Sequence, residues 1–394
     1  LATRLGYSTR QLNRLLLDGV GAGPLALARA QRAQTARTLI ETTDLGLAEI
    51  AFAAGFGSVR QFNDTVREVY AVVPSELRTA ARRQKPVGNG TITVRLAYRA
   101  PFHTAAMLEF LALRAIPGVE LVSGDSYARA MRLPYGTAHV RLQAAADHFL
   151  ATMRLADVRD LSPAVARCRR LLDLDADPIA VDGVLGADPA LAATVAAEPG
   201  VRVPRAVDGF EIAMRAIVSQ QISVAGAITV LGRIAASANR LGLDDLESNE
   251  HFGGDAANVS APEPEEAWLG LRPFPSPASV AKLSDSEFPM PKSRVATIRA
   301  LTEAIADDAV ALDGSVDRDE TRSALEALPG VGPWTANYVA MRALGDPDVF
   351  LQSDLGVRRG AALAGLSDKP NELAKHAARW APWRSYAVIR LWRM

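Results

Sequence analysis

A short helix-breaking motif constrains the fold of this chain most strongly. It reads Leu328-Pro329-Gly330-Val331-Gly332-Pro333, and apolar residues at helical spacing run up to it and resume after it. Prolines and glycines at this density end a helix. The pattern therefore predicts a helix, a tight hairpin and a second helix. Taken alone, such a turn is most often an ordinary connector between two helices.

The two glycines of the motif give the hairpin a further possible role. Gly330 and Gly332 leave the backbone uncovered, so amide N–H groups at the start of the second helix can approach a phosphate. Such a hairpin would hold a nucleic-acid backbone without reading its sequence. The predicted backbone-binding residues are Leu328, Pro329, Gly330, Val331 and Gly332.

A lone carboxylate follows the hairpin at short range. Asp354 comes after the apolar run 349–351 and begins another stretch with helical spacing. By itself, an aspartate in this place would most simply cap the helix. In combination with a phosphate-binding hairpin, Asp354 becomes the candidate catalytic acid.

Composition limits the remaining possibilities. The chain has 394 residues, 49% of them apolar, which predicts two or three domains. No apolar run approaches the length of a membrane span and no charged-then-apolar leader is present, so we expect no membrane partner and a cytoplasmic location. One cysteine, Cys168, excludes intrachain disulfides, and five scattered histidines lack metal-ligand spacing. We expect Cys168 to be buried and the site to hold no metal.

Residues 1–85 contain an internal repeat. The segment 8–13, STRQLN, returns 50 residues later as 58–63, SVRQFN, and a Gly-aromatic pair precedes each copy. Ser58 with Gln61 forms a capping box that would begin a helix after the break at 55–57. Both copies therefore read as helix-turn-helix units. A helical bundle with an accidental repeat is the alternative.

The first turns of the two repeated helices carry polar side chains that could reach base edges in a major groove. Twelve basic and seven acidic residues give this part of the chain a formal charge of +5, which suits DNA. The predicted base contacts are Arg10, Asn13, Arg14, Arg60 and Asn63.

The rest of the chain divides by pattern. Residues 86–90 are a linker, and residues 91–161 combine strand-like alternation with one helix, typical of a small α+β domain with an antiparallel sheet. Residues 162–394 are helical, apart from an acidic stretch at 244–267 that predicts a mobile loop. The predicted fold class is mainly α with one α+β domain.

Two known families resemble these segments. The tandem repeat, with the closing segment 73–78, resembles the AraC-type helix-turn-helix domain, with the chain starting inside its first helix. The hairpin, the segment 348–354 and the run 383–387 resemble AlkA-type 3-methyladenine-DNA glycosylases of the helix-hairpin-helix superfamily. The combination is similar to bacterial fusions of an adaptive-response regulator with AlkA, although nothing in this chain matches their methyl-accepting domain.

The resemblance implies roles for individual residues. Asp354 matches the catalytic aspartate, and Gln221 falls where the family inserts an apolar wedge into the duplex, so that a polar residue there is a departure. Four aromatic residues match the base pocket, although core packing is the commoner reason for such a cluster. They are Trp334, Tyr338, Trp392 and Phe110.

The resemblance also implies a function. It predicts a monofunctional glycosylase that removes alkylated bases from duplex DNA without cutting the strand, because Trp334 stands where bifunctional relatives carry a lysine nucleophile. Residues 1–85 would bind promoter DNA. The alternative is a regulator whose glycosylase half senses damage without turnover. We expect a monomer associated with the bacterial nucleoid and no cofactor, and the sequence leaves a structural cation at the hairpin open.

Overall fold

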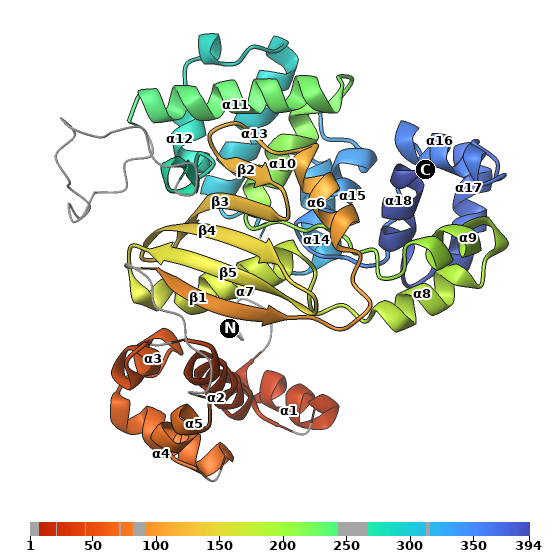
Figure 1. Cartoon of the computed structure of the whole chain (residues 1–394). Helices are drawn as coiled ribbons and strands as arrows, with labels where there is room; N and C mark the ends of the chain where they lie inside the picture. The colour runs from red at the N-terminus through yellow and green to blue at the C-terminus, as the bar shows by residue number, and fades with distance from the viewer. Residues whose placement is uncertain are drawn as a thin grey trace. The chain divides into compact units, whose positions relative to one another are not determined.

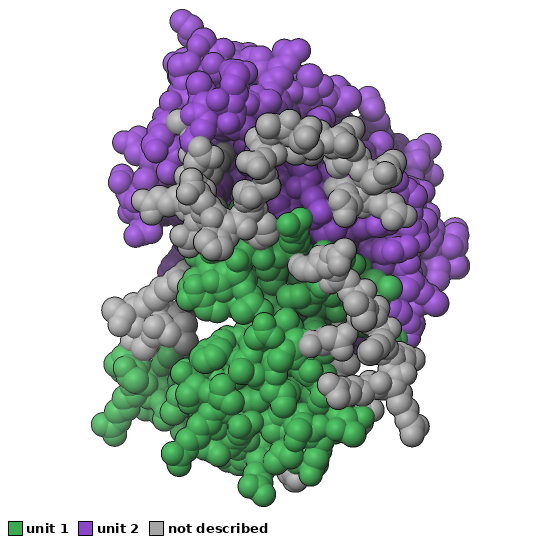
Figure 2. Space-filling model, turned by 60° about the vertical axis from the view of Figure 1, so that its left-hand side comes forward, with its two compact units in different colours: residues 1–95, 133–138, 150–166 green, residues 96–132, 139–149, 167–394 purple. Residues whose placement is uncertain are grey.

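The computed structural model describes residues 8–20, 22–43, 45–70, 72–81, 91–242, 267–312 and 316–394. The predicted linker at 86–90 lies outside these residues, as does all but the last residue of the predicted acidic loop at 244–267. The chain forms two compact units, one of residues 1–95, 133–138 and 150–166 and one of residues 96–132, 139–149 and 167–394 (Figure 2). The domain borders drawn from the sequence stay predictions.

The described residues of the N-terminal part form five helices. They are α1 (Thr9–Val20), α2 (Pro24–Thr42), α3 (Leu47–Ala53), α4 (Val59–Tyr70) and α5 (Pro74–Ala81). Ser58 caps its helix as predicted and Ser8 does the same for the first copy, because each hydroxyl accepts the amide N–H of the glutamine three residues later at 3.2 Å. The Gln61 side chain accepts from the N–H of Gly57 and not of Ser58. Local capping therefore fixes both helix starts.

A five-stranded antiparallel sheet has the order β1-β5-β4-β3-β2 (Figure 1). The strands are β1 (Ile92–Ala97), β2 (Glu120–Ser123), β3 (Ser126–Leu133), β4 (Gly136–Ala144) and β5 (His148–Leu155), and helix α6 (Thr104–Ala112) follows β1. In the β2–β3 pair, Glu120 faces Arg129 and Ser123 faces Ser126. The sequence did not predict β5. Its buried positions alternate, but Ala151 and Met153 among them have weak strand preference.

The helices that follow form two groups (Figure 1). In one group, contacts join α10 (Gly209–Val218), α11 (Val224–Arg240), α12 (Pro277–Lys282), α13 (Lys292–Ala306), α14 (Arg318–Glu326) and α15 (Pro333–Arg342). The other contains α8 (Pro178–Gly186), α9 (Pro189–Ala197), α16 (Leu355–Leu363), α17 (Pro370–Ala377) and α18 (Arg384–Arg393). The described residues also form helix α7 (Leu161–Leu171) and the one-turn segments η2 (Val158–Asp160), η3 (Ala267–Gly270), η4 (Asp285–Glu287) and η5 (Ala378–Trp380).

A buried ionic cluster ties the sheet to helix α10. Arg129 of β3 donates to Glu211 of α10 at 2.6 Å, and Arg215, one turn further along α10, donates to Glu211 at 2.8 Å and pairs with Glu120 of β2. The Tyr127 hydroxyl donates to Glu120 at 2.6 Å. The two arginines hold the pKa of Glu211 down at about 2 despite its burial. The cluster fixes α10 against β2 and β3. Removal of any one of its charges would leave a buried charge without its partner.

Candidate active site

The hairpin forms between α14 and α15 as predicted. The N–H of Val331 donates to the Leu328 carbonyl at 3.1 Å, and Pro333 occupies the first turn of α15. Gly330 has φ 79°, and a Cβ there would lie 2.1 Å from Thr297 Oγ1. A Cβ on Gly332 would meet nothing within 4 Å. The fold thus requires glycine at 330, whereas packing within the described chain gives no reason for glycine at 332.

Asp354 caps helix α16 and is fixed by three N–H donors. Oδ1 accepts the backbone N–H of Val357 at 2.9 Å and the indole N–H of Trp392 at 2.8 Å. Oδ2 accepts the indole N–H of Trp334 at 3.0 Å. Each carboxylate oxygen can accept about two hydrogen bonds. Oδ1 is therefore filled, and Oδ2 keeps the capacity for one further donor or for a nearby positive charge.

The four aromatic residues predicted for the base pocket lie together beside Asp354. Trp334 and Tyr338 come from α15, Trp392 from α18 and Phe110 from α6. Trp334 stacks on Tyr338 with ring centroids 5.4 Å apart, Tyr338 lies 6.2 Å from Trp392, and Trp392 stacks on Phe110 at 6.3 Å. An inserted ring would need its neighbours about 7 Å apart. The spacing therefore leaves no room for a flat ligand between Trp334 and Tyr338.

Glycine at position 356 makes the contact between Trp392 and Asp354 possible. A Cβ at this residue would lie 2.9 Å from Trp392 Cδ1 and 3.2 Å from Asp354 Oδ1. Any larger residue would push the indole away from the carboxylate. The sequence analysis missed Gly356, because a glycine in the first turn of a helix carries no local signal of this role.

Two arginines lie on the aromatic cluster and were also not predicted. The Cζ atom of Arg114 is 3.8 Å from the ring centroid of Phe110, and that of Arg342 is 4.7 Å from it. Arg342 also donates to the Tyr338 hydroxyl at 2.9 Å. Burial lowers the pKa of the Arg114 guanidinium to about 10. The available signal was Arg342 itself, the one charged residue of α15, four positions after Tyr338.

The predicted wedge residue lies in the loop between α10 and α11, beside the hairpin. The Gln220 side chain donates to the Gly330 carbonyl and to Thr335 Oγ1, both at 3.0 Å. Gln221 is exposed and has φ 59°, the left-handed conformation. The amide of Gln220 therefore already binds the Gly330 carbonyl, an oxygen that a cation at the hairpin could otherwise use.

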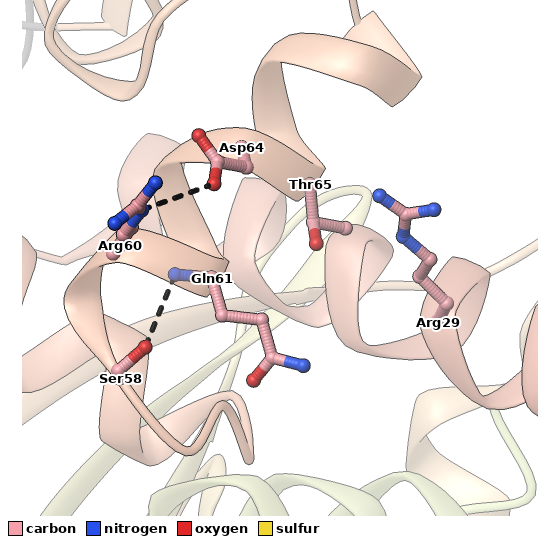
Figure 3. A pocket seen from close by; sticks show the side chains of 6 residues that line it. All are labelled: Arg29, Ser58, Arg60, Gln61, Asp64 and Thr65. Carbon is pink, nitrogen blue, oxygen red and sulfur yellow. Dashed lines mark hydrogen bonds and ion pairs between the residues drawn. The ribbon is translucent and has the colours of Figure 1, made fainter.

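The five predicted base contacts of the helix-turn-helix part are all exposed. Arg10, Asn13 and Arg14 lie on α1, and Arg60 and Asn63 on α4. The Asn13 side chain turns back toward Gly23, since a Cβ on Gly23 would lie 2.6 Å from its oxygen. Along α4 runs an open pocket of about 320 Å³, in which Arg60 faces Asp64 at 4.0 Å (Figure 3). Its lining residues are Arg29, Ser58, Arg60, Gln61, Asp64 and Thr65.

Comparison with known proteins places these parts in families. The profile of the AlkA N-terminal domain matches residues 93–208, and that of a helix-turn-helix domain matches residues 1–80. Over 395 residues the chain is 48% identical to a Mycobacterium tuberculosis protein described as "Probable bifunctional transcriptional activator/DNA repair enzyme AlkA", covering 100% of this chain and 75% of that one. This chain belongs to the AlkA family.

Other members and solved structures agree with this assignment. The AlkA part is 31% identical over 304 residues to DNA-3-methyladenine glycosylase 2 of Escherichia coli, covering 75% of this chain and 95% of that protein. The structure of a 3-methyladenine DNA-glycosylase from Archaeoglobus fulgidus superposes with a TM-score of 0.60 at 20% identity, over 76% of this chain and 96% of that one. The latter similarity supports the fold alone. The predicted family, fold class and helix-turn-helix part are thereby confirmed.

The described residues contain no group of three or more His, Cys, Asp or Glu side chains arranged to hold a metal ion. None of their helices is long and apolar enough to cross a bilayer. Cys168 is buried, as predicted, and burial raises the pKa of its thiol to about 12.

Proposed function

We propose that this AlkA family member is a monofunctional DNA glycosylase that hydrolyses the N-glycosidic bond of alkylated bases, such as 3-methyladenine, in duplex DNA and so starts base excision repair. One observation carries the proposal. The indole N–H groups of Trp334 and Trp392 both donate to Asp354, so the aromatic cluster and the acid form one unit. The 3-methyladenine in the description of the Escherichia coli relative supports the substrate class.

The base must leave the duplex before it can reach this unit. Flipping a nucleotide out of the stack costs about a few kcal/mol, and less where the base is damaged. The exposed hairpin, with glycine at 332, is suited to hold the backbone of the bent strand through amide N–H groups. Gln221, exposed in the neighbouring loop, is suited to fill the space that the base leaves.

Selection and bond cleavage follow from charge. Alkylation at a ring nitrogen gives a purine a positive charge, which weakens its glycosidic bond and favours stacking on electron-rich indole faces. As the bond breaks, positive charge develops on the sugar. Oδ2 of Asp354, with room for one more interaction, would stabilise that charge or orient the attacking water.

The lack of strand cleavage rests on Trp334. An indole has no amine that could attack the sugar and form a Schiff base, and its N–H is already used by Asp354. The product would be an intact strand with an abasic site. Borohydride should therefore trap no covalent adduct between the chain and damaged DNA, and a trapped adduct would refute this part of the proposal.

The helix-turn-helix domain would bind promoter DNA through Arg60 and neighbouring exposed residues, so that one chain joins repair to transcription. Its match to a helix-turn-helix family, and the description of the Mycobacterium relative as a transcriptional activator, also favour a second candidate. This is a regulator of an alkylation response whose glycosylase half senses damage without turnover. We infer that the chain acts as a monomer on nucleoid DNA in the cytoplasm.

Release of free base from a methylated duplex separates the two candidates. The purified chain should release 3-methyladenine in single-turnover conditions and leave abasic sites. If it protects promoter DNA from nuclease digestion but releases no base, the regulatory candidate stands and the enzymatic one fails.

A further inference from the structure

Gln221 holds a backbone conformation that the fold must enforce. It is one of the few described residues other than glycine with positive φ, at 59°. This region is sterically unfavourable for a residue with a Cβ. Strained residues of this kind cluster at ligand-binding positions. The surrounding loop must therefore supply the interactions that keep Gln221 in place.

Its neighbour Gln220 supplies those interactions. Both amide hydrogens of the Gln220 side chain are used, one on the Gly330 carbonyl and one on Thr335 Oγ1, each at 3.0 Å. The Gln220 main-chain carbonyl accepts from the Arg294 guanidinium at 2.6 Å. The two side-chain bonds join the loop to the hairpin and to the start of α15, and the third joins it to α13. Whatever backbone the hairpin holds, Gln221 is presented at a fixed position beside it.

The Gln221 side chain itself is left without a partner. It is exposed, and its amide forms no hydrogen bond with any residue that the structure describes. Ile222 and Val224 beside it are 39% and 44% exposed. In the loop, two exposed apolar side chains thus follow the Gln221 amide. Apolar side chains suit contact with the faces of stacked bases, and the amide suits hydrogen bonding to a base edge.

We propose that Gln221 enters the space vacated by the flipped nucleotide and hydrogen-bonds to the base left unpaired on the opposite strand. This inference rests on the proposed base flipping. A glutamine amide has donors and an acceptor, and the pairing edges of the four bases present different donor and acceptor patterns. Binding and excision therefore depend on the opposite base, which an apolar wedge of the same size could not distinguish by hydrogen bonding.

The test measures binding without any catalytic step. Duplexes carry tetrahydrofuran, a stable abasic analogue, opposite A, C, G or T, and the Kd of the full chain is measured for each in excess undamaged competitor. For the wild-type chain we expect the four Kd values to spread by roughly tenfold. Gln221→Leu, similar in size but apolar, should bring them within about twofold of each other. The inference would be overturned if Gln221→Leu kept the wild-type differences in Kd, or if the wild-type chain bound all four duplexes with the same Kd.

A matched control and a second measurement keep the outcomes distinct. Gln143→Leu makes the same change on an exposed residue of β4 and should keep the wild-type spread. Base release from methylated duplexes is measured in parallel. If the wild-type chain releases base normally but its Kd does not depend on the opposite base, only the role of Gln221 is refuted. If it releases no base but its Kd depends on the opposite base, the proposed enzymatic function is refuted instead.

Discussion

The indole N–H of Trp392 donates to Oδ1 of Asp354 at 2.8 Å across 38 residues of sequence. This bond places the last helix of the chain on the cap of α16, while Trp334 holds the other carboxylate oxygen from α15. The acid is therefore oriented by members of both helical groups. A side chain held in this way loses little entropy when it acts, which is what preorganised charge stabilisation needs.

Asp354→Asn should abolish most base release while leaving the fold intact. Asparagine caps helices about as well as aspartate, so unfolding should be little changed. Loss of the negative charge should lower the single-turnover rate by about 10³-fold, the scale of removing one preorganised electrostatic group. Release of 3-methyladenine from methylated duplex measures this. A rate within tenfold of wild type would disprove the catalytic assignment.

Gly356→Ala should act on the same site through Trp392. The new Cβ would lie 2.9 Å from the indole, which must move away from Asp354. We expect base release to fall by about tenfold, since one orienting hydrogen bond is lost. Gly183→Ala is the control, because its Cβ meets nothing within 4 Å and it lies in helix α8. An unaffected rate in Gly356→Ala would refute the positioning role.

The two hairpin glycines should separate folding from DNA binding. Gly330→Ala combines positive φ with a contact of 2.1 Å to Thr297 and should destabilise the chain by about 1–3 kcal/mol. Gly332→Ala should leave urea unfolding unchanged, because its Cβ meets nothing. If the exposed backbone approaches a phosphate, the added methyl should weaken binding of tetrahydrofuran-containing duplex by roughly tenfold. Unchanged affinity would exclude close approach at Gly332.

The buried Glu211 should make stability depend on pH in the acid range. Its folded pKa, about 2, lies below the usual 4.5 because Arg129 and Arg215 bind the carboxylate. The stabilisation is therefore complete above pH 4.5 and is lost as the pH falls toward 2, by about 3 kcal/mol over that range.

Glu211→Gln tests the assignment of this pH dependence. The variant should be less stable by about 3–5 kcal/mol at pH 7, because two buried arginines lose their partner. Its stability should also fall less steeply below pH 4.5 in urea titrations. Glu303→Gln, exposed on α13, should match the wild type in both respects. Equal acid slopes in the wild type and Glu211→Gln would contradict the role of this carboxylate.

Cys168 should report global unfolding. Burial raises its thiol pKa to about 12, so almost no thiolate exists at pH 8 and the thiol is covered. A disulfide reagent should react with the native chain at the rate of unfolding and at once in urea. Rapid stoichiometric labelling of the native chain would show that this part opens locally.

Local chemistry explains what the sequence by itself determined. The repeat, its serine caps, the Pro-Gly hairpin and the capping position of Asp354 depend on residues within a few positions of one another. Such patterns can be recognised from the sequence because the interactions that produce them join residues that are close together along the chain. The family resemblance named the aromatic residues of the base pocket, but not that two of them donate hydrogen bonds to Asp354.

The tertiary structure decided which distant groups meet. Gly356 matters only because the Trp392 indole packs against it. Gln220 matters only because the hairpin lies beside its loop. Strand β5 forms only because its neighbouring strands pair with it, although Ala151 and Met153 have weak strand preference. Arg342 reaches Phe110 of α6 across more than half the chain. These contacts depend on how helices and sheet pack, and packing is set by many side chains at once, so no local pattern encodes them.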